Sequence, residues 1–294
     1  MAKLLFLTFD LEEFDLPLDL CGITIEEKHM YEITRRGVEE VIEILDRTGV
    51  KSTFFTTASF GTRYPNLIKS LLKGGHEIAF HGYKHSQKYS KMGLRSAHEF
   101  IKKGKKMLED VTGEKIIGFR SPWFFAPPAE TLKKLGFEYD SSLHPTWVPG
   151  HYFNMRKPRS PYCKSGLKML PISVTPLLRL PLSWLWFRNF GLTYAKVCTN
   201  LCMLDQPYVN IYLHPWEFVD LSTRNGCSKL PLIIRRKTGG EMSRMVESYL
   251  RWCCKSGLKL LPMTVKNGLK HLMINNANSH PHHDELSAAH LIHC

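Results

Sequence analysis

The residues best suited to chemistry are two histidines four positions apart, His81 and His85, in the segment HGYKH. If this segment forms a helical turn, both imidazoles lie on one side of it and can reach one divalent ion. The chain contains fourteen histidines, so the spacing alone is weak evidence and more often marks a surface or structural role. It gains weight because a strand-like run, Glu77–Phe80, ends directly before His81.

An acidic cluster, Asp10, Glu12 and Glu13, follows the first strand-like run in the segment TFDLEE. Such a cluster can supply a metal ligand and a general base together. Two histidines, one carboxylate and a water form the open type of zinc site that catalysis uses. Side chains alternate along a strand, so Asp10 and Glu12 should face the same side, and Glu13 is the alternative ligand. The competing interpretation is an acid-rich helix N-terminus.

Two further polar residues follow strand-like runs. Arg120, in FRSPW, could orient a nearby carboxylate and keep it ionised, or form a surface salt bridge of little value. His214, in LHPWE, has a rigid proline behind it and could give a proton to a leaving group. A core histidine that is hydrogen-bonded to the backbone is the alternative for His214.

The elements that must position these residues alternate between strand and helix. Strand-like runs cover residues 3–9, 51–57, 77–80, 116–119, 137–139, 168–174, 209–213 and 259–265, and helical patterns cover 34–48, 64–73, 96–112, 128–135, 194–204 and 244–255. This alternation predicts parallel βαβ units. Asp10, His81, Arg120 and Asp140 each follow the C-terminal end of a strand. In a parallel barrel those ends share one face, where active sites collect.

Together, TFD, HxxxH, RxPW, DSS and LHP resemble the motifs of the polysaccharide deacetylases of carbohydrate esterase family 4, also called the chitooligosaccharide deacetylase homology domain. The resemblance runs from about Leu4 to Val265. It implies an α/β fold, an irregular (β/α)7-type barrel in a single domain, which hydrolyses an N-acetyl or O-acetyl group on a sugar. We expect residues 1–274 to form this catalytic barrel, and residues 275–294 to be a His-rich, disordered tail.

The resemblance assigns roles by position. It makes Asp10 the general base, His214 the general acid, Arg120 the residue that orients the base, Asp140 the acid that tunes His214, and His81 and His85 the metal ligands. Trp123 stands where the family usually has Tyr, whose backbone N–H helps to hold the oxyanion. We place Pro122 beside Trp123 on the substrate side, and Leu213 matches the apolar residue beside the acetyl methyl group.

One position departs from the common TFDDG form, in which the second Asp binds the metal. Leu11 occupies it here, which resembles a sub-branch with an FDxE motif, so that Glu12 becomes the third ligand. The expected cofactor is a divalent metal, most consistent with Zn²⁺. The same sub-branch contains metal-free amide hydrolases related to allantoinase. A metal-independent amidohydrolase and an inactive carbohydrate-binding barrel therefore stay open as alternatives.

The amino-acid composition and charge indicate which classes of binding partner to expect. The formal net charge is +13, which favours anionic partners. Nucleic acid is not expected, since no nucleic-acid-binding motif is present. The N-terminus shows no secretory signal, which favours a cytoplasmic location, including the inner face of the membrane. Residues 175–190 are apolar and aromatic and could either line the sugar groove or contact an anionic membrane. A lipid- or nucleotide-linked N-acetylated sugar is the substrate that fits this location.

Overall fold

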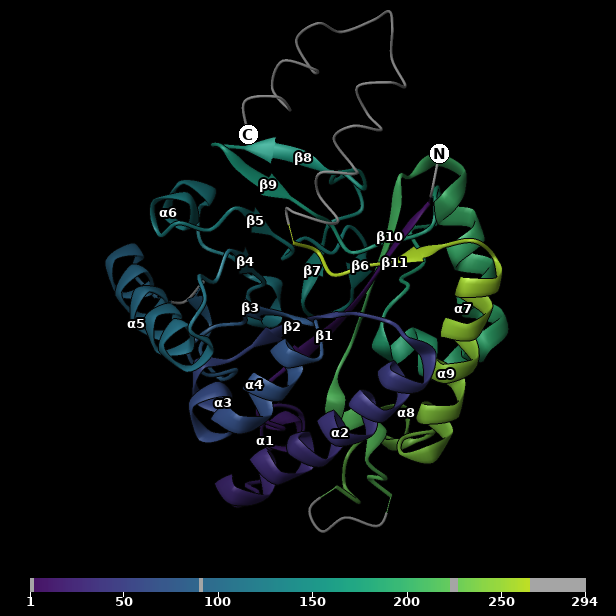
Figure 1. Cartoon of the computed structure of the whole chain (residues 1–294), viewed down its shortest axis with the longest axis horizontal. Helices are drawn as coiled ribbons and strands as arrows, with labels where there is room; N and C mark the ends of the chain where they lie inside the picture. The colour runs from purple at the N-terminus through teal and green to yellow at the C-terminus, as the bar shows by residue number, and fades with distance from the viewer. Residues whose placement is uncertain (1–2, 90–91, 223–226, 265–294) are drawn as a thin grey trace, which may run out of the picture.

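The computed structural model describes residues 3–89, 92–222 and 227–264, and its centre is a nine-stranded sheet that curls on itself (Figure 1). The strands are β1 (Leu4–Leu11), β2 (Thr53–Thr56), β3 (Glu77–Phe80), β4 (Gly118–Phe119), β5 (Tyr139–Asp140), β8 (Tyr162–Lys164), β9 (Leu167–Met169), β10 (Tyr208–Leu213) and β11 (Lys259–Leu260). Their order is β10-β1-β2-β3-β4-β5-β9-β8, and β11 also pairs with β1. All these pairs are parallel except β8 with β9.

The curl closes through loop residues. The Ser173 N–H donates to the Asn210 carbonyl over 2.9 Å, and the Asn210 N–H donates to Ser173 Oγ over 2.8 Å. An isolated parallel bridge joins Ser183 to Tyr212 further along β10. Because these contacts replace a regular strand pair, the barrel is irregular. The predicted α/β fold, an irregular (β/α)7-type barrel in a single domain, is confirmed.

Helices surround the outside of the curled sheet (Figure 1). They are α1 (Leu16–Cys21), α2 (Glu27–Thr48), α3 (Ala58–Arg63), α4 (Pro65–Lys73), α5 (Leu94–Thr112), α6 (Ala129–Lys134), α7 (Trp184–Asp205), α8 (Leu232–Arg235) and α9 (Gly240–Lys255), with 3₁₀ helices η2 (Pro122–Phe124) and η3 (Pro215–Phe218). A separate antiparallel hairpin pairs β6 (Trp147–Val148) with β7 (Tyr152–Phe153). Within the described ranges, no helix is long and apolar enough to cross a membrane.

Strand β1 has both of its faces buried, as expected of a central parallel strand. Leu5, Leu7, Phe9 and Leu11 belong to the core between the sheet and the helices. Leu4 and Phe6 belong to the smaller core inside the barrel, and Thr8 and Asp10 continue on their side of the strand. The strand therefore aims Asp10 along the inner face toward the C-terminal mouth.

The structure agrees with the sequence patterns more often on whether a segment is a helix or a strand than on the residues at which it begins and ends. Helix α2 begins at Glu27 rather than at residue 34, and its first turns contribute the buried Tyr31 and Ile33. Helix α7 begins at Trp184 rather than at residue 194 and so takes in the end of the apolar and aromatic segment 175–190, with a kink at Gly191, where φ is 81°. The predicted barrel residues 265–274 and the predicted tail 275–294 lie outside the described residues.

Candidate metal centre and active site

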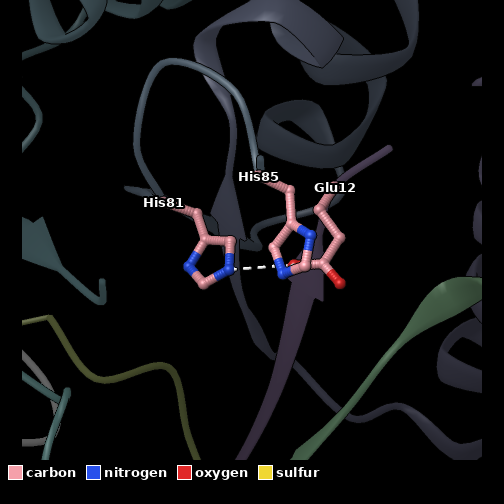
Figure 2. Close-up of side chains that lie close together, drawn as sticks. All are labelled: Glu12, His81 and His85. Carbon is pink, nitrogen blue, oxygen red and sulfur yellow. Dashed lines mark hydrogen bonds and ion pairs between the residues drawn. The ribbon is translucent and has the colours of Figure 1, made fainter. Parts of the chain in front are cut away.

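Glu12, His81 and His85 point toward one another at the mouth of the barrel (Figure 2). Glu12 Oε2 lies 3.0 Å from His81 Nε2 and 3.3 Å from His85 Nε2. All three side chains are buried. A tetrahedral ion with bonds of about 2.1 Å holds its ligand atoms about 3.4 Å apart, so this donor set fits a divalent ion such as Zn²⁺.

The expectation of a helical turn at HGYKH is wrong. Residues 81–85 form an irregular loop, and Gly82 has a φ of 90°, which no α-helix contains. A Cβ atom on Gly82 would stand 2.9 Å from Pro122 Cγ, so the loop passes too close to η2 for a side chain. The two imidazoles nevertheless converge, with ring centroids 6.2 Å apart, because the loop folds back over the strand ends.

Each imidazole is oriented by a second contact on its far nitrogen. His81 Nδ1 donates to the Arg120 carbonyl over 2.9 Å, and His85 Nδ1 donates to Asp15 Oδ1 over 2.6 Å. Both rings therefore turn Nε2 toward Glu12. Partners of this kind fix the ring and raise its basicity as a ligand.

Charge is balanced inside the cluster. Burial alone would raise the pKa of Glu12, but the charge of His85, the hydrogen bond from His81 and the charge of His214 lower it to about 2. Burial would lower the pKa of His85, but the charges of Glu12 and Asp15 and the hydrogen bond to Asp15 raise it to about 10. The Glu12 carboxylate is thus anionic at neutral pH, and the proton on His85 occupies the position that a cation would take.

Glu13 faces a different set of groups. Its carboxylate accepts from Tyr31 Oη over 3.0 Å, from Thr57 Oγ1 over 3.2 Å, and from the hydroxyl of Ser59. It also accepts the backbone N–H of His85 over 3.2 Å. Burial, the largest effect, raises its pKa. Glu13 therefore braces the histidine loop, while Glu12 faces both imidazoles, as strand alternation predicts.

Asp10 and Arg120 form a buried ion pair beside the cluster. Arg120 Nη1 donates to Asp10 Oδ1 over 2.6 Å and to Thr8 Oγ1 over 2.9 Å. Its other nitrogens donate to Ser141, and its guanidinium lies 4.0 Å from the centroid of the Phe55 ring. With its donors fixed in this way, Arg120 holds one oxygen of Asp10 and orients the other.

His214 follows β10 and turns Nε2 toward Glu12, with Glu12 Oε1 at 3.7 Å. On the opposite side, Glu217 Oε1 lies 3.5 Å from His214 Nδ1 and accepts the His214 backbone N–H over 2.9 Å. Burial would lower the pKa of His214, but the Glu217 carboxylate 3.5 Å from Nδ1 and the charges of Glu12 and Asp10 outweigh it, so the pKa is raised. The rings of Trp184 and Trp216 pack against the imidazole.

Arg188 holds Glu217 in place. Its Nη1 donates to Glu217 Oε2 over 2.6 Å, and its Nη2 donates to the Ile234 carbonyl over 2.5 Å. Neither the arginine nor the glutamate is exposed. Two charges buried at this depth are stable only as a pair, so the position of Glu217 depends on Arg188.

The contacts described for Asp140 differ from those that the resemblance implies. Its carboxylate accepts from the backbone N–H of Ser142 over 2.8 Å and from the Ser142 hydroxyl. Burial, partly offset by these hydrogen bonds and by the charge of Arg120, raises the pKa of Asp140 to about 6. Within the described residues, the carboxylate that contacts the far side of His214 is Glu217, and the role that the resemblance assigns to Asp140 stays a prediction.

A pocket opens above the cluster, and most of its wall is aromatic. Asp10, Glu12, His81, His85 and His214 all line it, together with Trp123, Tyr152, Trp184, Trp186 and Tyr212. Trp123 stacks between His85 and His151, with centroid distances of 5.0 and 5.7 Å. Its backbone, like that of Phe124, lies in the left-handed region (φ of 59° and 62°), a conformation that costs free energy and is common at functional sites.

Two predicted substrate contacts do not line this pocket. Leu213 belongs to the core between the sheet and the helices, and the residue before it, Tyr212, faces the pocket instead. The reason is the alternation of side chains along β10. Pro122 is buried against Gly82, whereas its neighbours Ser121 and Trp123 line the pocket.

Several site residues were missed at the level of sequence. Asp15 and Glu217 carried a usable signal, since each is a carboxylate within a few positions of a predicted site residue. Arg188 and His144 carried none. His144 is buried in the pocket wall, its Nδ1 lies 2.8 Å from Tyr152 Oη, and burial lowers its pKa to about 3. Arg188 reaches the site from helix α7 and His144 from the loop after β5, and no periodicity predicts that these segments meet there.

Comparison with known proteins agrees with this geometry. Residues 2–139 match the family model described as polysaccharide deacetylase. A peptidoglycan deacetylase-like protein, FGM2, of Gibberella zeae is 23% identical over 259 residues, which cover 82% of this chain and 76% of the relative.

Two crystal structures share the fold, each with a TM-score of 0.63. A putative polysaccharide deacetylase from Mycobacterium smegmatis is 21% identical, and the match covers 94% of this chain and 92% of the other. The Puue allantoinase is 16% identical, and the match covers 96% of this chain and 93% of the other. At these identities the likeness concerns the fold alone, and a fold can host several activities. Residues 2–139 thus match the polysaccharide deacetylase family, and a relative that is 23% identical extends the likeness to deacetylases over 82% of the chain.

Proposed function

We propose that the protein is a metal-dependent deacetylase that removes an N-acetyl, or O-acetyl, group from an amino-sugar-containing substrate. The single observation that carries this proposal is the convergence of three groups in one pocket: the cluster of Glu12, His81 and His85, the ion pair of Asp10 with Arg120, and His214. The family match and the relatives' names support the reaction class.

The residues of the chain divide the work of amide hydrolysis. Asp10 takes a proton from the attacking water, and Arg120 keeps the Asp10 carboxylate in the orientation that this transfer needs. The pKa of His214 is raised, which favours the protonated imidazole. His214 gives this proton to the departing amine. The products are acetate and a free amino sugar.

Glu12, His81 and His85 would hold the divalent ion. Zn²⁺ is the ion that two imidazoles and one carboxylate favour in such an open site. When bound, it supplies an activated water and a positive charge for the carbonyl oxygen. The backbone N–H of Trp123, at the pocket wall, is the candidate donor for the same oxygen.

The aromatic pocket wall supports a sugar as the substrate, because aromatic faces stack on the apolar faces of sugar rings. We extend the proposal to a lipid- or nucleotide-linked precursor and to a cytoplasmic location at the inner face of the membrane. Cell fractionation tests the location, and a panel of soluble N-acetylated sugars, nucleotide sugars and lipid-linked sugars tests the linkage.

Acetate release tests the reaction. The native protein, its chelator-treated form and the Zn²⁺-reloaded form are assayed on N-acetylated glycans, with elemental analysis of each. Metal-dependent acetate release supports the proposal. Turnover of a small amide or ureide without bound metal would favour the allantoinase-related alternative, and no turnover by metal-loaded protein would favour an inactive barrel.

Variants distinguish the roles. Asp10→Asn should keep the bound metal and abolish turnover, since it removes only the base. His81→Ala should lose metal and turnover together. Full activity in Asp10→Asn would remove Asp10 from the mechanism.

A further inference from the structure

The pocket has an apolar outer rim that nothing in the described fold covers. Five of the large apolar side chains that are more than half exposed belong to it: Leu177 (93%), Leu178 (72%), Phe153 (66%), Phe190 (60%) and Trp147 (57%). We refer to these five residues as the apolar rim. Exposed apolar groups that gather in one place, unlike single ones, indicate an interaction surface.

Contacts between neighbouring residues join the segments that carry the rim residues. Trp147 and Phe153 face each other across the β6–β7 hairpin, with ring centroids 6.4 Å apart. Thr146 Oγ1 donates to the Arg179 carbonyl over 2.8 Å, and Arg179 Nη1 donates to the Lys157 carbonyl over 3.1 Å. These two bonds join the hairpin to the turn that carries Leu177 and Leu178.

The same turn reaches helix α7. Tyr194 Oη donates to the Pro181 carbonyl over 2.8 Å, and the Tyr194 ring lies 5.2 Å from that of Phe190. Phe190 in turn stacks on Trp186, a pocket residue, at 5.6 Å. The rim therefore follows the outer side of the two elements, the β6–β7 hairpin and α7, whose inner side forms the pocket wall.

The turn presents its leucines in a strained conformation. Leu177 and Arg179 have φ values of 57° and 55°, in the left-handed region that side chains other than glycine rarely adopt. Packing within the fold does not compensate this strain, because the side chains of Leu177 and Leu178 are exposed. Display of Leu177 and Leu178 to an apolar partner would account for it.

Charge identifies the partner. From Ser141 to Leu204 the sequence contains no Asp or Glu, and it contains eight Lys and Arg residues, of which Arg188 is buried against Glu217 and Arg159 pairs with Asp205. Arg156 and Lys157 come three and four residues after β7 and are exposed, and the Arg179 guanidinium bonds to the segment after the hairpin. A second copy of the chain would bring like charges together across this face. An anionic lipid surface satisfies both the apolar side chains and the cations.

We propose that the apolar rim docks on an anionic membrane and brings the pocket to a sugar held at the lipid surface. The docking stands on the surface alone, whereas the identification of the substrate class rests on the proposed deacetylase function. The pocket mouth lies between the two docking elements, so a lipid-anchored sugar would reach it without leaving the membrane.

Vesicle co-sedimentation of the full chain tests the docking. The vesicles are phosphatidylcholine with and without phosphatidylglycerol, at low and high salt. Wild-type protein should bind the anionic vesicles and lose most of that binding at high salt. Leu177→Ser/Leu178→Ser and, separately, Arg156→Glu/Lys157→Glu should each weaken binding by about tenfold or more.

Matched controls come from α5, which lies at the opposite side of the view from α7 in Figure 1. Leu94 is 63% exposed and Lys102 is exposed, so Leu94→Ser and Lys102→Glu make the same chemical changes away from the rim. Both should bind vesicles like the wild type. Equal vesicle binding by the rim and control variants would overturn the proposal. It would also be overturned if the wild-type protein did not bind anionic vesicles.

Two other measurements separate the possible failures. A concentration-dependent dimer that Leu177→Ser/Leu178→Ser makes monomeric would assign the rim to self-association and overturn the docking. Acetate release from a soluble N-acetylated sugar should be unchanged in the rim variants, because none of their residues touches the reacting groups. Vesicle binding without any acetate release would refute the deacetylase function and leave the membrane docking standing.

Discussion

The contact between Glu217 and His214 makes a prediction that can separate two candidate acids. Glu217→Gln keeps the size of the side chain and removes its charge. The Gln oxygen can still accept from Arg188 or from the His214 backbone, but the negative charge 3.5 Å from His214 Nδ1 is gone. Arg188, which has no exposed surface, then lacks a counter-charge.

Two magnitudes follow for this variant. Leaving Arg188 with a neutral partner should lower the free energy of unfolding by about 1–3 kcal/mol. A positioned general acid contributes about a hundredfold or more to the rate, so kcat should fall by about that factor. KM should change little, because His214 acts on the leaving group in the transition state rather than on bound substrate.

The pH profile gives the sharper measurement. His214 must carry its proton to act as an acid, so activity falls as pH rises through the His214 pKa. Glu217 raises that pKa, and removing its charge lowers it. The alkaline limb of the kcat profile should therefore move to lower pH in Glu217→Gln and stay in place in Asp140→Asn. A limb that moves only in Asp140→Asn would refute the reasoning and support Asp140 in the role that the resemblance assigns.

Three further changes test other parts of the fold. Glu12→Gln should lower Zn²⁺ affinity by more than about tenfold while Glu13→Gln keeps one ion per chain, as measured by elemental analysis; equal losses would contradict the assignment of Glu12. Burial, partly offset by hydrogen bonds, raises the pKa of Glu77 to about 7, so the ionised side chain destabilises the fold increasingly as pH rises from its ordinary pKa of 4.5 through 7. The stability of Glu77→Gln relative to wild type should thus grow by about 3 kcal/mol between about pH 4 and pH 8 in denaturant titrations, and a constant difference would refute it. A Cβ atom on Gly37 would stand 1.9 Å from the Pro215 carbonyl oxygen, so Gly37→Ala should lower stability by about 1–3 kcal/mol, visible in thermal unfolding; an unchanged transition would show that α2 and η3 separate freely.

The parts of the site that the sequence could predict are those set by strand periodicity. Asp10 lies near the end of the buried strand β1, and His81, Arg120 and His214 directly follow β3, β4 and β10. In the structure Asp10, His81 and His214 line one pocket, and Arg120 pairs with Asp10. Periodicity also decides which face a residue takes. The family-based expectation for Leu213 was wrong, because alternation along β10 turns this side chain into the core and turns Tyr212 into the pocket.

The parts that could not be predicted depend on loops and on distant segments. The loop at HGYKH brings its histidines together through a positive φ at Gly82, which a pattern of spacing does not reveal. Arg188 lies 29 positions before Glu217, and only the packing of α7 against η3 and α8 brings the two charges within 2.6 Å. Such long-range pairs leave no local signal in a single sequence.

The geometry of β1 explains why a carboxylate at position 12 can replace the second Asp of the common TFDDG form. Here the strand stays regular through Leu11, so position 11 faces the core between sheet and helices, where Leu11 has no exposed surface. A carboxylate at that position would be buried among apolar groups at a high cost in desolvation. Position 12 is the next on the side of Asp10, and a glutamate there places Oε2 3.0 Å from His81 and 3.3 Å from His85. The FDxE motif therefore reaches the two imidazoles from the first residue after the strand, which continues the alternation of β1.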